Sequence, residues 1–281
     1  MPRARGASRS LPPKIVADQV RLLVESGRPE VTLTGIDLGH YGADLVPRAS
    51  LAGLLRELVE IDGLRWLRLS SMLPAYFTDD VLDVLTGSPA IAPHFHVPLQ
   101  SGSDRVLRAM RRPYSVKMYR LVIERLAGAI PRMGLGADVI AGFPGETDED
   151  AAATEALIDA LPFTYLHVFP YSDRKGTEAA ARPAHVDGKT ITRRAARLRA
   201  LGAAKAGAFR RSLVGRTEDV LVLETPDRAT GGLVGLTGNY LEVVFDGPEA
   251  LRGRMVRVRV AGVDAGGVSG EMVAYPEGKH R

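Results

Sequence analysis

The sequence of 281 residues contains no cysteine. This absence excludes disulfide bonds, zinc sites built from thiolates and cysteine nucleophiles. The chain also has no apolar run that approaches the roughly 20 residues of a membrane-spanning helix. Its basic start, MPRARGASRSLPPK, lacks the apolar core of a secretory signal. We therefore expect a cytoplasmic protein without a membrane partner.

Acidic residues are missing from one long segment. Residues 189–216 contain nine Lys or Arg and neither Asp nor Glu, whereas the whole chain has a net charge of only +4. The usual interpretation of such a run is a solvated helix face. Like charges without nearby acids also favour a counter-ion such as RNA phosphate, which makes this segment a candidate RNA-binding helix or helix pair. The candidate contacts are Arg193, Arg194, Arg197, Arg210 and Arg211.

Two kinds of strand pattern are present. Apolar, strand-like runs lie near residues 31, 66, 94, 136 and 165, and helical patterns separate them. This alternation is typical of a parallel α/β barrel or a doubly wound sheet. From about residue 217 the pattern changes to short alternating strands divided by glycines: DVLVLE, LVGLTGNYLEVVF, RMVRVRVAGV and VSGEMVAY. These strands predict a small all-β barrel.

Local signals predict where several elements begin. Pro13 begins a helix, and residues 30–36 form a buried strand. Residues 94–112 read as a strand, a polar Gln-Ser-Gly-Ser turn and a helix capped by Asp104. Thr147 caps a helix whose acidic first turn complements the helix dipole, so we expect these acids to be structural.

Two histidines raise the question of a metal. His94 and His96 alternate along one strand and so share a face. No third imidazole or carboxylate follows at a recognisable ligand spacing, so the sequence predicts no metal site. Asp138 places a carboxylate in the otherwise apolar strand LGADVIAGF, which is costly if the carboxylate is buried without a partner.

Four blocks carry a family resemblance. In chain order they are LTGIDLGHYG (33–42), HFHVPLQSGSDRVLRAMRRPYS (94–115), ADVIAGFPGETDED (137–150) and LHVFPYSDRKGTEAA (166–180). They resemble the radical S-adenosylmethionine methylthiotransferases, and the resemblance covers nearly the whole chain. It implies an incomplete parallel (β/α)6 barrel over residues 1–181, a basic helical connector over 182–216 and a TRAM-like RNA-binding β-barrel over 217–281.

The resemblance implies a function and cofactors. Such enzymes use S-adenosylmethionine and 4Fe-4S clusters to insert a methylthio group at carbon 2 of an adenosine in the tRNA anticodon loop. The segment GLTGNYLEVVF is most similar to the subgroup acting on N6-threonylcarbamoyladenosine 37. Isopentenyladenosine tRNA, a ribosomal protein as substrate, and a non-catalytic tRNA-binding remnant stay open as alternatives. A barrel enzyme acting on a phosphorylated metabolite is disfavoured, because no Gly-rich phosphate loop joins an acid/base pair.

The missing cysteines bear directly on that implied activity. In the family, three closely spaced cysteines after the first barrel strand hold the catalytic cluster. This chain resembles the family only from the segment that follows, so the resemblance implies a truncated protein without its first strand and cluster loop. We expect such a chain to be inactive alone.

The implied ligand contacts lie where barrel strands end. They are Gly35, Ser70, Ser71, Gln100, Asp138, Pro170 and Tyr171. At Gly35 the lack of a side chain lets the backbone approach the methionine moiety of S-adenosylmethionine. In the terminal barrel, Tyr240 offers a ring for stacking on RNA, and Arg257 and Arg259 offer cations.

Overall fold

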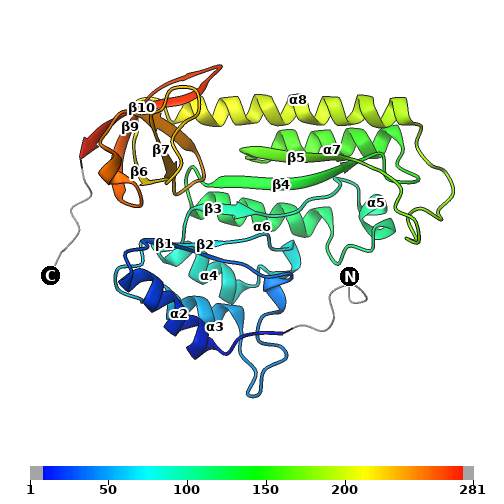
Figure 1. The fold of residues 1–281 in the computed structure, drawn as a ribbon. Helices are drawn as coiled ribbons and strands as arrows, with labels where there is room; N and C mark the ends of the chain where they lie inside the picture. Colours follow the sequence, from blue (N-terminus) through cyan, green and yellow to red (C-terminus); the bar gives the residue numbers. More distant parts are fainter. Residues whose placement is uncertain (1–8, 275–281) are drawn as a thin grey trace. The chain divides into compact units, whose positions relative to one another are not determined.

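The computed structural model describes residues 9–274 (Figure 1). The chain divides into two compact units, and each is built from segments that are not consecutive. Unit 1 comprises the described residues of Met1–Met72, Thr78–His94 and Leu213–Arg281. Unit 2 comprises Leu73–Phe77 and Phe95–Ser212. The predicted domain boundaries follow chain order, whereas these units interleave.

Unit 1 contains a small parallel sheet with helices. Its elements are α2 (Pro13–Glu25), β1 (Glu30–Leu33), η1 (Leu38–His40), α3 (Leu51–Leu58), β2 (Trp66–Leu69) and α4 (Asp79–Gly87). Strands β1 and β2 pair in parallel, with Leu33 opposite Leu69. The prediction of a buried strand through residue 36 is wrong, because β1 ends at Leu33 and Ile36 is 70% exposed. Among the described residues, β1 pairs only with β2 and is therefore an edge strand.

Unit 1 also contains a closed five-stranded β-barrel with strand order β10-β8-β7-β6-β9. Its elements are β6 (Thr217–Val222), β7 (Leu233–Thr237), β8 (Glu242–Phe245), η3 (Glu249–Leu251), β9 (Met255–Asp264) and β10 (Gly267–Ala274). In β9, the buried Val256 and Val258 alternate with the exposed Arg257 and Arg259, as a packed barrel interior requires. The predicted all-β barrel is confirmed, although Tyr275 of its final strand lies outside the described residues.

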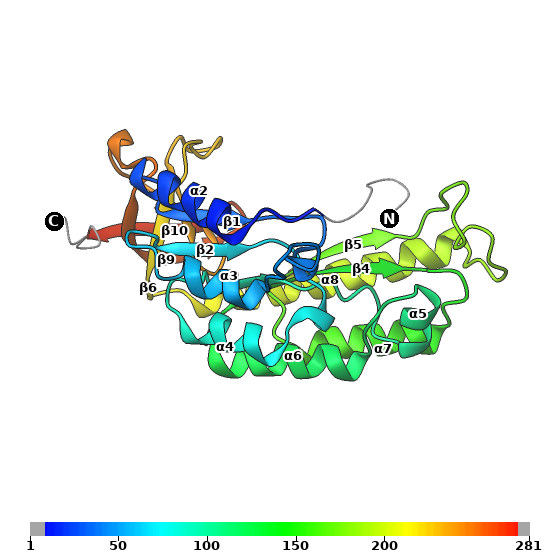
Figure 2. The same ribbon diagram turned by 90° about the horizontal axis from the view of Figure 1, so that it is seen from below.

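Unit 2 holds most of a three-stranded sheet, β3-β4-β5, whose first residue, His94, belongs to unit 1. Its elements are η2 (Pro74–Tyr76), β3 (His94–His96), α5 (Asp104–Ala109), α6 (Val116–Ala129), β4 (Gly134–Ala141), α7 (Asp148–Ala160), β5 (Tyr165–Pro170) and α8 (Gly188–Ser212). Figures 1 and 2 show α6, α7 and α8 running alongside β4 and β5. The fully buried Leu135, Ala137 and Val139 alternate along β4 with Asp138, which is only half-buried. One sheet face is therefore apolar core, and the other carries polar side chains.

All five predicted α/β strands exist, but the described residues arrange them in two parallel sheets, one of two strands and one of three. Beyond β2, an isolated parallel bridge between Leu67 and Ile91 continues the pairing. The predicted cap of α5 is wrong by one residue, because the Ser103 hydroxyl accepts from the Val106 N–H and Asp104 is already helical. Within residues 9–274, no helix is both long and apolar enough to span a bilayer.

Candidate functional site

The Gln-Ser-Gly-Ser loop after β3 is fixed in place by backbone pairing. Gln100 is buried and has a left-handed backbone, with φ of 64°. Its N–H donates to the Asp138 carbonyl at 2.8 Å, and its carbonyl accepts from Ile140 at 2.9 Å. Gly102 donates to Thr154 Oγ1 at 2.9 Å, and a Cβ at Gly102 would lie 2.5 Å from the Thr154 Cα. Glycine is therefore required where α7 approaches the loop.

Asp150 anchors the same loop from the first turn of α7. Its carboxylate accepts from Ser103 Oγ at 2.6 Å and from the Thr147 N–H at 2.8 Å, and it forms an ion pair with Arg105. Burial alone raises the pKa of Asp150, but Arg105, Ser103 and Thr147 together outweigh burial and hold that pKa far below its usual range. The predicted structural role of these acids is consistent with this network.

We expect Asp150→Asn to destabilise the fold at pH 7 by about 1.5–3 kcal/mol, the usual contribution of hydrogen bonds to a charged group. Because the folded-state pKa is depressed, the wild-type advantage is complete above the unfolded-state pKa of about 3.9 and disappears as pH falls toward the folded-state value. Urea unfolding of the wild type and of Asp150→Asn between pH 7 and pH 3 measures this difference in the free energy of unfolding. Asp159→Asn, on the exposed side of α7, is the control; an equal loss there, or a pH-independent difference, contradicts the prediction.

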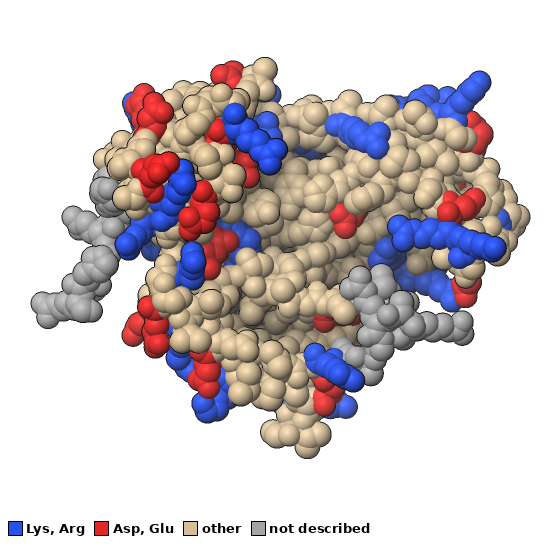
Figure 3. Space-filling view, in the orientation of Figure 1, with Lys and Arg blue, Asp and Glu red and all other residues tan. Residues whose placement is uncertain are grey.

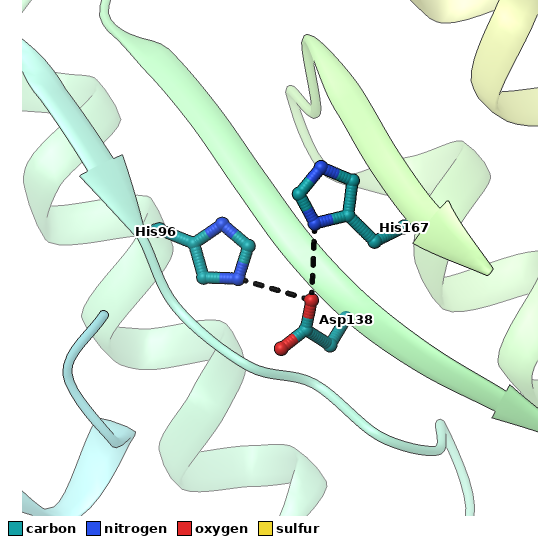
Figure 4. A group of neighbouring side chains, drawn as sticks. All are labelled: His96, Asp138 and His167. Carbon is teal, nitrogen blue, oxygen red and sulfur yellow. Dashed lines mark hydrogen bonds and ion pairs between the residues drawn. The ribbon is translucent and has the colours of Figure 1, made fainter. Parts of the chain in front are cut away.

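Three polar side chains converge on the face of the β3-β4-β5 sheet that carries Asp138 (Figure 4). His96 Nε2 lies 3.2 Å from Asp138 Oδ1, and His167 Nδ1 lies 3.3 Å from the same oxygen. In the β4–β5 register Asp138 is directly opposite His167. Burial alone raises the pKa of Asp138, but the two imidazoles outweigh it and the net effect is a lowered pKa. The carboxylate is therefore ionised at neutral pH.

Tyr165 supports this group from a neighbouring position on β5. Its hydroxyl lies 3.1 Å from His96 Nδ1, the ring nitrogen that faces away from Asp138. The Tyr165 ring lies over Gly136 on β4, where a Cβ would come within 2.0 Å of the ring. Glycine at position 136 therefore leaves the space in which Tyr165 reaches His96.

Sequence reasoning identified Asp138 but missed His167 and Tyr165. It paired His96 with His94 instead, whereas His94 stacks on the ring of Tyr240, with 4.3 Å between centroids. The sequence did contain one signal that could have found them: Tyr165 and His167 are two residues apart on β5 and therefore share one face. The sequence does not show the register in which β5 pairs with β4.

The predicted ligand contacts of unit 1 lie at the ends of its two parallel strands. Ser70 follows β2, and its N–H donates to the Leu33 carbonyl at 2.9 Å. The Ser70 hydroxyl is buried without a hydrogen-bond partner in the structure, so it fits a polar group of a bound ligand. Ser71 and Gly35 are exposed. A Cβ at Gly35 would meet only ordinary contacts with Leu38, so nothing in the chain itself requires glycine there.

The predicted ligand contacts of unit 2 are distributed along the sheet. Gln100 and Asp138 are joined through the backbone as described above, whereas Pro170 and Tyr171 lie at the end of β5. Tyr171 donates its N–H to the Ala141 carbonyl at 2.8 Å and its hydroxyl to Asp173 at 2.9 Å. Burial is the largest cause of a raised Tyr171 pKa, so this phenol stays protonated at neutral pH.

One of the predicted RNA contacts is part of the protein interior. Arg194 is only 6% exposed, and its guanidinium donates to Glu146 and to Asp148, each at 2.7 Å. Arg197 pairs with Glu155 at 2.6 Å but keeps an exposed side chain. The α7 helix thus supplies acids that the α8 sequence lacks, and Arg194 stabilises the fold instead of presenting charge to RNA.

The other predicted RNA contacts are exposed. They are Arg193, Arg210 and Arg211 on α8, and Tyr240, Arg257 and Arg259 in the terminal barrel. Figure 3 shows basic side chains spaced along the region of α8 with acidic ones among them. Tyr240 is 50% exposed although its ring stacks on His94 and lies 5.1 Å from the Arg68 guanidinium. Arg259 pairs with Glu271 at 2.6 Å.

Comparison with known proteins decides the family. The family model described as "Radical SAM superfamily" matches residues 1–158. This chain belongs to the radical SAM superfamily. Its fold is also similar to that of Escherichia coli coproporphyrinogen III oxidase HemN, a radical SAM enzyme, with a TM-score of 0.50 and 16% identity. That likeness covers 81% of this chain and 59% of HemN, and it concerns the fold alone.

Two curated relatives are more similar in sequence. The chain is 38% identical over 263 residues to threonylcarbamoyladenosine tRNA methylthiotransferase MtaB of Bacillus subtilis (strain 168), covering 92% of this chain and 58% of that protein. It is 36% identical over 267 residues to tRNA-2-methylthio-N(6)-dimethylallyladenosine synthase of Clavibacter michiganensis subsp. michiganensis. That match covers 92% of this chain and 51% of the relative. The chain therefore spans about half the length of these relatives.

The residues present do not fit the iron–sulfur cluster of this superfamily. Radical SAM enzymes combine S-adenosylmethionine with a 4Fe-4S cluster held by cysteine thiolates, and this chain has no cysteine. No step of a reaction can be assigned to a cluster held by thiolates of this chain.

Proposed function

We propose that this chain is the barrel and RNA-binding part of a tRNA methylthiotransferase that acts on carbon 2 of N6-threonylcarbamoyladenosine 37 in the anticodon loop. The observation that carries the proposal is sequence similarity over 92% of the chain to two enzymes whose names specify methylthio-modified tRNA adenosines. The resemblance of GLTGNYLEVVF to the threonylcarbamoyl subgroup supports the choice between them.

We propose different roles for the strand ends of unit 1 and for the exposed arginines. The unsatisfied Ser70 hydroxyl supports a ligand-binding role for the strand ends of unit 1, where S-adenosylmethionine is proposed to bind. The exposed arginines of α8 and of the terminal barrel support a role in holding tRNA phosphates. We propose the terminal barrel as a TRAM-like module, with the exposed part of Tyr240 available to a base.

Nucleoside mass spectrometry of tRNA tests the substrate. This chain has no thiolate for a cluster, so the proposal requires that other residues than its own supply the cluster. On that basis, we expect deletion of the gene that encodes this chain to abolish 2-methylthio-N6-threonylcarbamoyladenosine and to leave the unmethylthiolated nucleoside in its place. Loss of the methylthio derivative of isopentenyladenosine instead would assign the other substrate. Unchanged levels of both would favour an RNA-binding protein without methylthiotransferase activity.

Binding measurements test the RNA surface. We expect the double variant Arg210→Glu/Arg211→Glu to weaken tRNA binding about tenfold and to reduce the slope of log affinity against log salt by about two, because each arginine neutralises one phosphate. Fluorescence anisotropy at several salt concentrations measures both quantities. Arg120→Glu on α6, outside the proposed surface, is the control; equal losses in the two proteins would contradict a specific role for α8.

A further inference from the structure

We propose that His96, Asp138 and His167 form a binding site for a divalent transition-metal ion of the zinc or iron(II) class. Two imidazoles and one carboxylate on adjacent positions of a rigid sheet are a ligand set that such ions use in many proteins. Neither the radical SAM membership nor the proposed tRNA substrate requires a metal ion here, and the site uses no thiolate.

The distances suit a shared ion. In a tetrahedral zinc site with bonds of about 2.0–2.1 Å, neighbouring ligand atoms lie about 3.3–3.4 Å apart. The two nitrogen-to-oxygen distances at Asp138 Oδ1 are 3.2 Å and 3.3 Å. All three ligand atoms lie within 4.8 Å of one another. The His167 side chain is 55% exposed, so its ring has room to turn toward an ion held by the other two ligands.

The surroundings of His96 match those of a metal-bound imidazole. A ligating histidine usually donates its second ring N–H to an oxygen, which fixes the ring and its tautomer. Here Nε2 faces Asp138 and Nδ1 faces the Tyr165 hydroxyl at 3.1 Å, and Gly136 makes room for that tyrosine. Binding a metal at Nε2 makes Nδ1–H the donor to Tyr165. In the other neutral tautomer, Nε2–H donates to Asp138 and Nδ1 accepts from the Tyr165 hydroxyl.

The site has an open side and a net charge. Three protein ligands leave at least one coordination position for water or for a ligand atom, unlike the closed four-ligand structural sites. One carboxylate and two neutral imidazoles around a divalent ion leave a charge of +1, which favours an anionic or oxygen-donor group at the open position.

Other histidines provide matched controls. Within residues 9–274, His40 pairs with Asp37 at 2.7 Å and His185 with Asp173 at 3.5 Å, so each offers an imidazole beside a carboxylate. Only His96, Asp138 and His167 form a group of three such ligands in this part of the chain. Because the chain has no cysteine, no thiolate competes for the ion.

The test is a metal titration of the full chain, purified without a histidine tag and freed of metal by a chelator. Zn²⁺ is titrated in competition with a chromophoric chelator, and Co²⁺ is used to read the coordination number from its visible absorption. We expect one equivalent of Zn²⁺ and at least tenfold weaker binding by His96→Gln, Asp138→Asn and His167→Gln. His40→Gln and His185→Gln are expected to bind within about twofold of wild type.

His167→Gln decides the case if the other variants fail to fold, because His167 is the most exposed of the three ligands. The nitrogen-15 shifts of the His96 ring report the change of tautomer that binding requires. Wild-type affinity no tighter than that of His167→Gln, or an equal loss in His185→Gln, would overturn the proposal. In that case the three side chains form only a hydrogen-bonded group. The titration uses neither RNA nor S-adenosylmethionine, so its outcome is independent of the proposed function.

Discussion

Purified and supplied with iron and sulfide under reducing conditions, this chain is expected to form no 5′-deoxyadenosine from S-adenosylmethionine above the level of a protein-free control. The physical reason is the absence of cysteine. In radical SAM methylthiotransferases the electron that splits the carbon–sulfur bond comes from a cluster held on thiolates. Imidazoles and carboxylates of this chain offer no equivalent three-thiolate set. The expected effect is complete loss, measured by liquid chromatography with mass spectrometry.

The Bacillus subtilis relative, assayed in the same way, is the positive control for reconstitution. Binding of S-adenosylmethionine, measured by calorimetry, separates a chain that cannot bind the ligand from one that binds it without cleavage. Ser70→Ala, which removes the unsatisfied buried hydroxyl, is expected to weaken any such binding. Turnover of S-adenosylmethionine by the reconstituted chain would show that the cluster is held by other ligands.

Arg68→Ala is expected to lower the free energy of unfolding by about 3–5 kcal/mol, the usual cost of removing one partner of a buried ion pair. Arg68 is 4% exposed, and its Nε and Nη2 donate to the two Glu30 oxygens at 2.6 Å and 3.0 Å. Its Nη1 donates to the Gly238 carbonyl at 2.9 Å. The substitution leaves a buried carboxylate and a buried carbonyl without these donors.

The chain offers a close control for this variant. Arg65 lies three residues earlier and also forms an ion pair, with Asp219, but its side chain is 52% exposed. We expect Arg65→Ala to cost no more than about 1 kcal/mol, because solvent screens exposed pairs. Urea unfolding measures both. The double variant Arg68→Met/Glu30→Leu is expected to recover part of the stability, since it removes both buried charges. Equal effects of the two arginines would contradict this account.

Much of the fold could be predicted from local patterns. Pro13 predicted the start of α2, and Thr147 predicted the cap of α7. The alternation of apolar residues along β9 predicted a barrel strand with one buried face. Each of these signals acts over only a few residues. The division of the parallel strands into two sheets was not predicted. Nothing in the sequence near β2 or β3 specifies which strand lies next to which, since pairing depends on the whole chain.

The candidate site shows the same limit at the level of side chains. The carboxylate of Asp138 was recognised because a charge in an apolar strand needs a partner. One of its two partners, His167, is 29 residues away and lies opposite Asp138 in the β4–β5 register. Arg194 was misjudged for a related reason. Its acids are Asp148 on α7 and Glu146 in the loop before α7, so a segment without acids of its own can still be neutralised by its neighbours.

The interleaving of the two units has a consequence for synthesis on the ribosome. Arg68 and Glu30 emerge early, but the Gly238 carbonyl that completes their environment is made only after the whole of unit 2. Domains generally fold as they leave the ribosome, starting from the amino terminus. Unit 2 can therefore fold first, while β1 and β2 wait without the terminal barrel. A ribosome that pauses before β7 would leave the buried Arg68–Glu30 pair without the Gly238 carbonyl that Arg68 also binds, so this part of unit 1 would stay incomplete until the barrel is made.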